Sequence, residues 1–298
     1  MNPAQPPLVS ILIVTWNRRR ELPRAIESAL SQTYSSIEVV VVDNASTDGT
    51  ADEVRARFSQ LSLVEAGRNL GCPSGRNFGF RHCHGKYIYC LDDDGWLKPD
   101  AVEHAVSRAE AEPRIAVVMS RIHETGEDGQ VRRLPENRDE PVYQSSFCGG
   151  CSLIRREAID QVGAFPEDFF RQAEEEDLAI RLLDSGWFCF LEPESVMFHA
   201  PSPVGRNSKA FLYYGLRNTN KTGLRVWSFP WCVLRPLVNL GHALRFMFTH
   251  RYVELPFLVL FSLVRDLVSL PGRRSPVSAR TNELYFRLGK QPTVTRPA

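Results

Sequence analysis

The chain has 298 residues, which is long enough for one large α/β domain, or for one domain with an appendage, and a chain of this size needs no disulfide staples. Its formal net charge is only +1, yet residues 205–298 hold fifteen Lys or Arg against three Asp or Glu, while residues 1–204 carry a net charge of −11. This asymmetry predicts two regions that face different partners, and the basic region favours an anionic surface.

The seven cysteines show no regular spacing, and we interpret them as reduced thiols. The N-terminal residues contain no basic segment followed by an apolar one, so no secretory signal is expected and the protein is predicted to be cytoplasmic. The sequence contains no internal repeat and no low-complexity segment.

The first hundred residues alternate continuous apolar runs with segments of helical spacing. The apolar runs predict strands over 8–15, 37–43, 61–66 and 86–94. Helices are expected between them, over 16–34, 50–58 and 74–83. This alternation predicts an α/β fold with a mostly parallel sheet flanked by helices.

The pattern continues beyond residue 100 with longer connections. Strands are expected over 115–123 and 189–200, and helices over 101–111 and 174–187. The segment 147–165 predicts a Gly-rich turn, a short strand and a helix, and the polar stretch 124–142 predicts a hairpin or a mobile loop.

The last third of the chain is rich in aromatic and aliphatic residues. Two apolar segments, 226–248 and 255–270, are interrupted by charged residues and fall short of the roughly 18–20 uninterrupted apolar residues of a spanning helix. They favour interfacial helices that lie on a bilayer, and a helical subdomain packed on the core is the alternative. We therefore predict a catalytic domain over 1–222 and an amphipathic helical region over 223–298 that associates with a membrane or packs as a subdomain.

Polar residues follow three of the predicted strands. They are Thr15 to Arg18, Asp43 to Asp48 and Asp92 to Asp94. Ligands bind at the carboxyl ends of parallel strands, so these groups are expected to share one site. Carboxylates two residues apart can hold a hard divalent cation, and Mg²⁺ or Mn²⁺ with diphosphate oxygens is the natural match.

The acidic triplet allows a second interpretation. Asp92, Asp94 and Gly95 also fit the aspartyl-phosphate motif of haloacid-dehalogenase-like phosphatases, which implies a metal-dependent phosphatase. That motif normally ends the first strand of its domain, whereas three strands precede it here, so the phosphatase is kept as an alternative.

The order of motifs over residues 10–220 resembles the family 2 glycosyltransferases, which have a GT-A fold. The segments that carry the resemblance are VSILIVTWNR (9–18), IEVVVVDNASTDGT (37–50), RNLGCPSGRNFGF (68–80), YIYCLDDDGWLKPD (87–100), GGCSLIRREAIDQVGAFPEDFF (149–170), EEEDLAIRLLDSGW (174–187), VMFHAPSP (196–203) and YYGLRN (213–218). Family members are inverting, metal-dependent transferases that use nucleotide-sugar donors.

The resemblance implies roles for individual residues. Donor-binding residues would be Thr15, Asn17, Arg18, Asp43, Arg76, Asn77 and Asp92. Asp94 would be the metal ligand that bridges the diphosphate, with Asp92 and His199 completing the Mg²⁺ or Mn²⁺ site.

The general base is expected in the acidic segment that opens the helix over 174–187. All four positions from Glu174 to Asp177 are acidic, so the family's acidic motif can be aligned in more than one register. We favour Asp177, then Glu176, with Glu175 possible in a longer form of the motif.

The sequence thus predicts an inverting transfer of a sugar from a UDP-, dTDP- or GDP-linked donor to an acceptor hydroxyl. The acceptor is expected to be a glycan or lipid-linked molecule of polysaccharide, lipopolysaccharide or glycolipid assembly. We expect a peripheral location on the cytoplasmic face of a membrane and no nucleic-acid partner. A catalytically inactive nucleotide-sugar-binding module stays as a further alternative.

Overall fold

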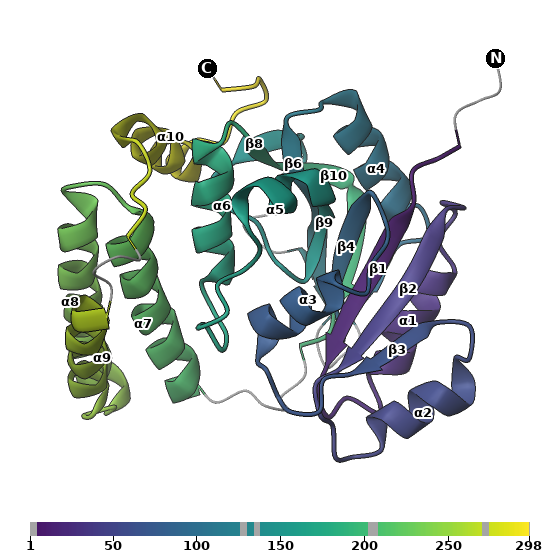
Figure 1. Cartoon of the computed structure of the whole chain (residues 1–298), viewed down its shortest axis with the longest axis horizontal. Helices are drawn as coiled ribbons and strands as arrows, with labels where there is room; N and C mark the ends of the chain where they lie inside the picture. The colour runs from purple at the N-terminus through teal and green to yellow at the C-terminus, as the bar shows by residue number, and fades with distance from the viewer. Residues whose placement is uncertain (1–4, 126–129, 134–137, 202–207, 270–273, 298) are drawn as a thin grey trace.

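A ten-stranded sheet forms the centre of the chain in the computed structural model, which describes residues 5–125, 130–133, 138–201, 208–269 and 274–297 (Figure 1). Its main path runs in the order β3-β2-β1-β4-β9-β6-β10-β5, with β7 paired to β6 and β8 paired to β10. The strands are β1 (Val9–Thr15), β2 (Ile37–Asp43), β3 (Ser62–Glu65), β4 (Tyr87–Asp92), β5 (Gly95–Leu97), β6 (Ile115–Thr125), β7 (Val131–Arg133), β8 (Val142–Gln144), β9 (Cys151–Arg155) and β10 (Phe188–His199).

The first four strands pair in parallel, as the continuous apolar runs predicted. Their apolar side chains are buried because helices cover both faces of the sheet. The second half is mixed, because β9 runs antiparallel between β4 and β6. The predicted α/β fold with a largely parallel sheet is confirmed.

Helices flank both faces of this sheet. They are α1 (Leu22–Leu30), α2 (Thr50–Arg57), α3 (Cys72–Phe80), α4 (Ala101–Ala111), α5 (Arg156–Val162) and α6 (Glu174–Asp184). Apolar residues of α1 and α4 pack against one face, and those of α3, α5 and α6 pack against the other. The helix expected over 16–34 is shorter than predicted, since α1 begins at Leu22 with a proline in its first turn.

The strand order of the sheet has its switch point between the parallel strands β1 and β4. From β1, the path turns to β2 and β3 on one side and to β4 on the other. Strand register sets Thr15 opposite Asp43 and Val14 opposite Asp92. The polar residues after these strands therefore meet at one edge, which is where open α/β sheets bind ligands.

The C-terminal helices form a separate layer beside α6 (Figure 1). They are α7 (Ser208–Val226), α8 (Trp231–His250) and α9 (Leu255–Ser269), which pack against one another, and α10 (Ala279–Lys290), which returns to α6 and β8. The boundary predicted between residues 222 and 223 falls inside α7. Thr293 pairs with Tyr143 at the sheet, and Phe286 of α10 packs on Trp227 and Trp231, so the chain after α9 contacts both the sheet and the junction of α7 and α8.

Candidate functional site

Asp43 lies at the carboxyl edge of the sheet, and its two carboxylate oxygens differ in their hydrogen bonding. Its Oδ2 accepts a hydrogen bond from the backbone N–H of Ser46 at 3.1 Å. Its Oδ1 is buried and has no hydrogen-bond partner among the described residues. A buried acceptor without a partner is costly, so this oxygen is suited to an N–H donor from a ligand.

The loop after β1 is tied to the loop after β2. Asn17 has a left-handed backbone with φ of 54°, its Oδ1 accepts from the Thr47 N–H at 2.8 Å, and its own N–H donates to the Ser46 hydroxyl at 2.9 Å. The Asn17 side chain therefore holds two loops together next to Asp43. Its contribution to a ligand pocket would be through the position of these loops.

Three predicted metal ligands come together at the end of β4 and β10. The ligand atoms of Asp92, Asp94 and His199 lie within 4.8 Å of one another. Nε2 of His199 is 3.0 Å from Oδ1 of Asp94. His199 arrives there because it pairs with Gly95 across the antiparallel strands β10 and β5. Two carboxylates and one imidazole form a donor set that fits Mn²⁺ or Mg²⁺.

The acidic triplet lies in the turn from β4 into β5, and the structure gives Asp93 a partner. Nε of Arg18 lies 3.3 Å from Oδ1 of Asp93, and both side chains are largely buried. Burial raises the pKa of Asp93 to about 7, against the opposing effect of Arg18. Arg18, predicted as a donor-site residue, thus also anchors the turn that carries Asp92 and Asp94.

Arg76 is the cationic centre of the site. Its guanidinium, which is buried, lies 3.1 Å from Asp92, 3.3 Å from Glu174 and 3.8 Å from Glu175. A buried arginine with three carboxylates can fix the orientation of each of them. Arg76 therefore links the end of β4 to the start of α6.

A pair of glycines makes room for this cluster. A Cβ on Gly150 would lie 2.0 Å from the Asp92 carboxylate, and one on Gly149 would lie 2.5 Å from the Arg76 guanidinium. The backbone N–H of Gly149 also donates to Oε1 of Glu175 at 3.1 Å. The Gly-rich turn predicted before β9 is thus part of the site itself.

The four acidic residues that open α6 have different surroundings. Asp177 is 0% exposed and lies between Arg181, at 2.9 Å, and Arg225. Glu176 points toward α8, where its Oε2 is 3.2 Å from Arg235. These two carboxylates, which the sequence favoured as the base, are therefore occupied by structural ion pairs on the side of α7 and α8.

Glu174 and Glu175 face Arg76 and Asp92 instead. Glu174 is nearly fully buried, and this burial, together with the neighbouring Glu175, raises its pKa to about 8. The Glu175 side chain is 22% exposed, so solvent can reach it. Burial also raises the pKa of Glu175, although Arg76 opposes the shift. Of the three predicted bases, Glu175 alone has its carboxylate in the Arg76 cluster.

The turn before α6 is held by a residue to which the sequence assigned no role. Gln172 and Ala173 have left-handed backbones with φ of 71° and 64°. Nδ2 of Asn218, on α7, donates to the carbonyl oxygens of Arg171 and Gln172 at 2.7 and 2.9 Å. Asn218 lies in the segment YYGLRN, but no spacing rule connects it to a turn 46 residues away.

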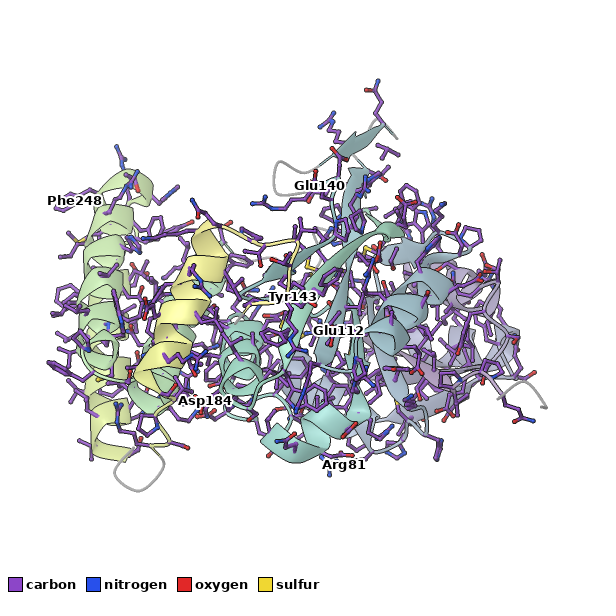
Figure 2. All side chains as sticks on the ribbon, turned by 90° about the horizontal axis from the view of Figure 1, so that it is seen from above. Arg81, Glu112, Glu140, Tyr143, Asp184 and Phe248 are labelled. Carbon is purple, nitrogen blue, oxygen red and sulfur yellow. The ribbon has the colours of Figure 1, made fainter. Side chains whose placement is uncertain are left out.

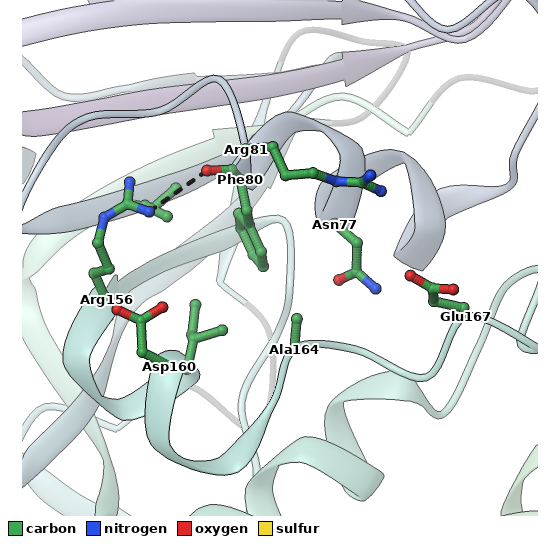
Figure 3. A pocket seen from close by; sticks show the side chains of 9 residues that line it. Asn77, Phe80, Arg81, Arg156, Asp160, Ala164 and Glu167 are labelled. Atoms are coloured by element: carbon green, nitrogen blue, oxygen red, sulfur yellow. Dashed lines mark hydrogen bonds between the residues drawn. The ribbon is translucent and has the colours of Figure 1, made fainter.

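Asn77 lies apart from the other predicted donor residues. Its amide bonds both backbone groups of Phe165, at 2.8 and 3.1 Å. It lines a pocket of about 420 Å³ between α3 and α5, together with residues such as Arg81 and Asp160 (Figure 3). None of the predicted metal or base residues lines this pocket. The position of Asn77 indicates a structural role in joining α3 to the segment before α6.

Comparison with known proteins gives a family and a fold. Residues 10–163 match the family model of Glycosyl transferase family 2. Over 190 residues the chain is 28% identical to the chondroitin synthase of Escherichia coli, and the match covers 61% of this chain but only 27% of that protein.

Solved structures resemble the chain over most of its length. GalNAc-T7 with UDP, GalNAc and Mn²⁺ matches with a TM-score of 0.64 and 18% identity, over 82% of this chain and 51% of that one. The mannosyltransferase PcManGT from Pyrobaculum calidifontis, in complex with GDP-Man and Mn²⁺, matches with a TM-score of 0.58 and 21% identity, over 95% of this chain and 79% of that one. At these identities the likeness shows the fold alone.

Proposed function

This chain belongs to glycosyl transferase family 2, and we propose that it transfers a sugar from a nucleoside diphosphate to an acceptor hydroxyl with inversion at the anomeric carbon. The observation that carries the proposal is the meeting of Asp43, the group of Asp92, Asp94 and His199, and Glu175 at one edge of the sheet. The family match runs through the acidic triplet, which leaves the phosphatase interpretation without support.

The donor's base would bind at Asp43. Uracil, thymine and guanine each carry a ring N–H, and Oδ1 of Asp43 is a buried acceptor that lacks a partner among the described residues. This match supports a UDP-, dTDP- or GDP-linked donor. Arg18 would support the same site from the loop after β1, through its ion pair with Asp93.

The diphosphate would bind beside Asp92, Asp94 and His199, which would hold Mg²⁺ or Mn²⁺. When bound, such an ion neutralises charge that develops on the leaving diphosphate. Arg76 holds Asp92 in place, and His199 holds Asp94, so both carboxylates are oriented before any ligand arrives.

Glu175 would act as the general base. An inverting transfer needs one carboxylate to take the proton from the acceptor hydroxyl, and it needs no covalent nucleophile. The Gly149 N–H and Arg76 orient the Glu175 carboxylate, which remains partly exposed. A raised pKa makes this carboxylate a stronger base than an ordinary glutamate.

A donor panel tests the proposal. UDP-, dTDP- and GDP-sugars are each titrated with and without Mn²⁺, and binding and slow hydrolysis of the donor are measured. We expect one nucleotide class to bind in a Mn²⁺-dependent manner. A protein that binds a donor but neither hydrolyses nor transfers the sugar would be the inactive module, and no metal-dependent binding of any donor would contradict the proposal.

The substitution Gly150→Ala tests whether the glycine pair shapes the site. The new Cβ would overlap the Asp92 carboxylate and displace it, so we expect kcat/KM to fall about a hundredfold, as a misplacement of about 1 Å can produce. Gly215→Ala is the matched control, because a Cβ there meets nothing within 4 Å. Equal activity of the two variants would show that Asp92 need not stay where the structure places it.

We propose that the acceptor is a glycan or a lipid-linked molecule, used in polysaccharide, lipopolysaccharide or glycolipid assembly. The chain spans about a quarter of the chondroitin synthase that it matches. None of the described helices is both long enough and apolar enough to cross a membrane. The proposed location is the cytoplasmic face of a membrane, where a lipid-linked acceptor would be within reach.

A further inference from the structure

The hairpin of α8 and α9 exposes apolar side chains and buries polar ones, which is the reverse of the usual arrangement in a water-soluble domain. On α9, the exposed side chains include Phe257 and Phe261, which are 68% and 70% exposed. The buried side chains of the same helix include Ser262 and Asp266, which are 1% and 2% exposed. An amphipathic helix in water shows the opposite arrangement, with its apolar stripe toward the protein.

Polar contacts with α7 hold the hairpin in this orientation. On α8, the buried Asn239 donates through Nδ2 to Thr219 and to Asn220, both at 2.7 Å. On α9, Asp266 lies 3.7 Å from Lys221. Rotating either helix to bury its apolar residues would break these contacts and leave buried polar groups without partners. The outward position of the apolar residues is therefore specified by the sequence.

The outward residues form one surface along both helices. Its members, which we call the apolar face, are the exposed residues Val233, Leu234, Leu237, Val238, Leu244, Phe248, Phe257, Leu258, Leu260, Phe261, Val264, Leu267 and Val268. They recur at helical spacing, and α8 packs against α9. The hairpin lies on the side of α7 away from the sheet, and Phe248 is at its outer edge (Figures 1 and 2). A continuous apolar surface of this extent marks an interaction site.

The charges around the apolar face indicate its partner. Arg245, Arg251 and Arg265 are exposed on and between α8 and α9. The acidic residues of this segment are already paired, Glu254 with Lys209, and Asp266 with both Lys221 and the neighbouring Arg265. An isologous contact between two copies would bring the same cationic surfaces together, which is unfavourable. An anionic headgroup layer above hydrocarbon matches both the arginines and the apolar side chains.

We propose that the apolar face of α8 and α9 lies in the interface of a bilayer that contains anionic phospholipid. Neither helix meets the length and hydropathy that a membrane-crossing helix needs, so the hairpin would lie along the surface. Arg235 of α8 pairs with Glu176, the neighbour of Glu175. The bound bilayer would therefore be joined through α8 to the helix that carries the proposed base. This binding does not depend on the proposed sugar transfer.

Vesicle binding by the full chain tests the proposal without donor or acceptor. We expect co-sedimentation with vesicles of phosphatidylcholine containing 30% phosphatidylglycerol, and binding at least about tenfold weaker to phosphatidylcholine alone. The double variant Phe257→Gln with Phe261→Gln should bind the anionic vesicles at least about tenfold more weakly. Leu30→Gln with Val294→Gln, which changes exposed apolar residues outside the apolar face, should bind like wild type.

Two further measurements keep the outcomes distinct. The variant Arg245→Glu with Arg251→Glu should remove the preference for anionic vesicles, and all variants should keep the wild-type melting temperature because the changed side chains are exposed. Equal binding of wild type and the Phe257, Phe261 variant would overturn the proposal. The proposal would also be overturned if the wild-type protein formed a dimer and did not bind vesicles, while the Phe257, Phe261 variant was a monomer. Since the assay contains no donor, a negative result leaves the proposed sugar transfer standing.

Discussion

Replacing Glu175 by Gln should lower turnover by about 10²–10⁴-fold while donor binding stays near the wild-type value. Gln keeps the size of the side chain and its oxygen can still accept from the Gly149 N–H, but it cannot take a proton from an acceptor hydroxyl. The measurement is kcat at saturating donor and acceptor, together with the Kd of the donor in the presence of Mn²⁺. The melting temperature should change little, because the side chain is partly exposed.

The variant Asp177→Asn is the informative comparison. Asp177 is buried between Arg181 and Arg225, so removing its charge leaves two arginines without their shared partner. Breaking a buried pair is strongly destabilising, by about 3–5 kcal/mol, and we therefore expect a lower melting temperature as the primary effect. If Asp177→Asn instead abolishes turnover in a protein of unchanged stability, while Glu175→Gln remains active, the base is Asp177 and our assignment is wrong.

The acidic segment shows why the sequence ranks the candidate bases differently from the structure. Four consecutive acidic residues at the start of a helix differ only in the direction in which each side chain points. Which direction faces the site depends on Arg225 and Arg235, which lie on helices 48 and 59 residues beyond their partners Asp177 and Glu176. No local pattern contains that information. The existence of an acidic helix start at the site was predictable, and its register was not.

The strands and the sheet edge were predictable because a local sequence pattern specifies them. The runs that became β1 and β2 are continuous and β-branched, and the run that became β4 is continuous and partly aromatic; in a parallel sheet their carboxyl ends must meet. The closeness of Asp43 to the acidic triplet follows from that rule. Asp93 had no predicted role, because its partner Arg18 lies on a different loop, 75 residues earlier.

The C-terminal helices pack on one another and on the rest of the chain, as the subdomain interpretation expected, and their placement on a bilayer stays a prediction. Helices α8 and α9 pack on α7 through polar side chains such as Asn239 and leave their apolar side chains outside. Apolar periodicity identifies the helices, but it cannot show which face contacts the protein. That choice is set by buried polar residues of α7, including Asn220, which precede the predicted boundary at residue 222.

Replacing Asp94 by Asn should reduce the Mn²⁺-dependent affinity for the donor by at least about a hundredfold. The change removes one of two carboxylates from the cluster with Asp92 and His199, and with it a negative charge that a divalent cation needs. The measurement is the Kd of the nucleotide identified by the donor panel, titrated over a range of Mn²⁺ concentrations.

Asp100→Asn is a suitable control for Asp94→Asn, because this carboxylate lies just before α4 and pairs with Lys98 outside the cluster. His199→Asn should produce a smaller loss than Asp94→Asn, since it removes a neutral ligand and the hydrogen bond that orients Asp94, but no negative charge. If the loss of Mn²⁺-dependent donor affinity is largest for Asp94→Asn, smaller for His199→Asn and absent for Asp100→Asn, the effect comes from a metal site and not from the removal of any one carboxylate. Wild-type Mn²⁺ dependence in Asp94→Asn would contradict the assignment of Asp94 as a ligand of the cation.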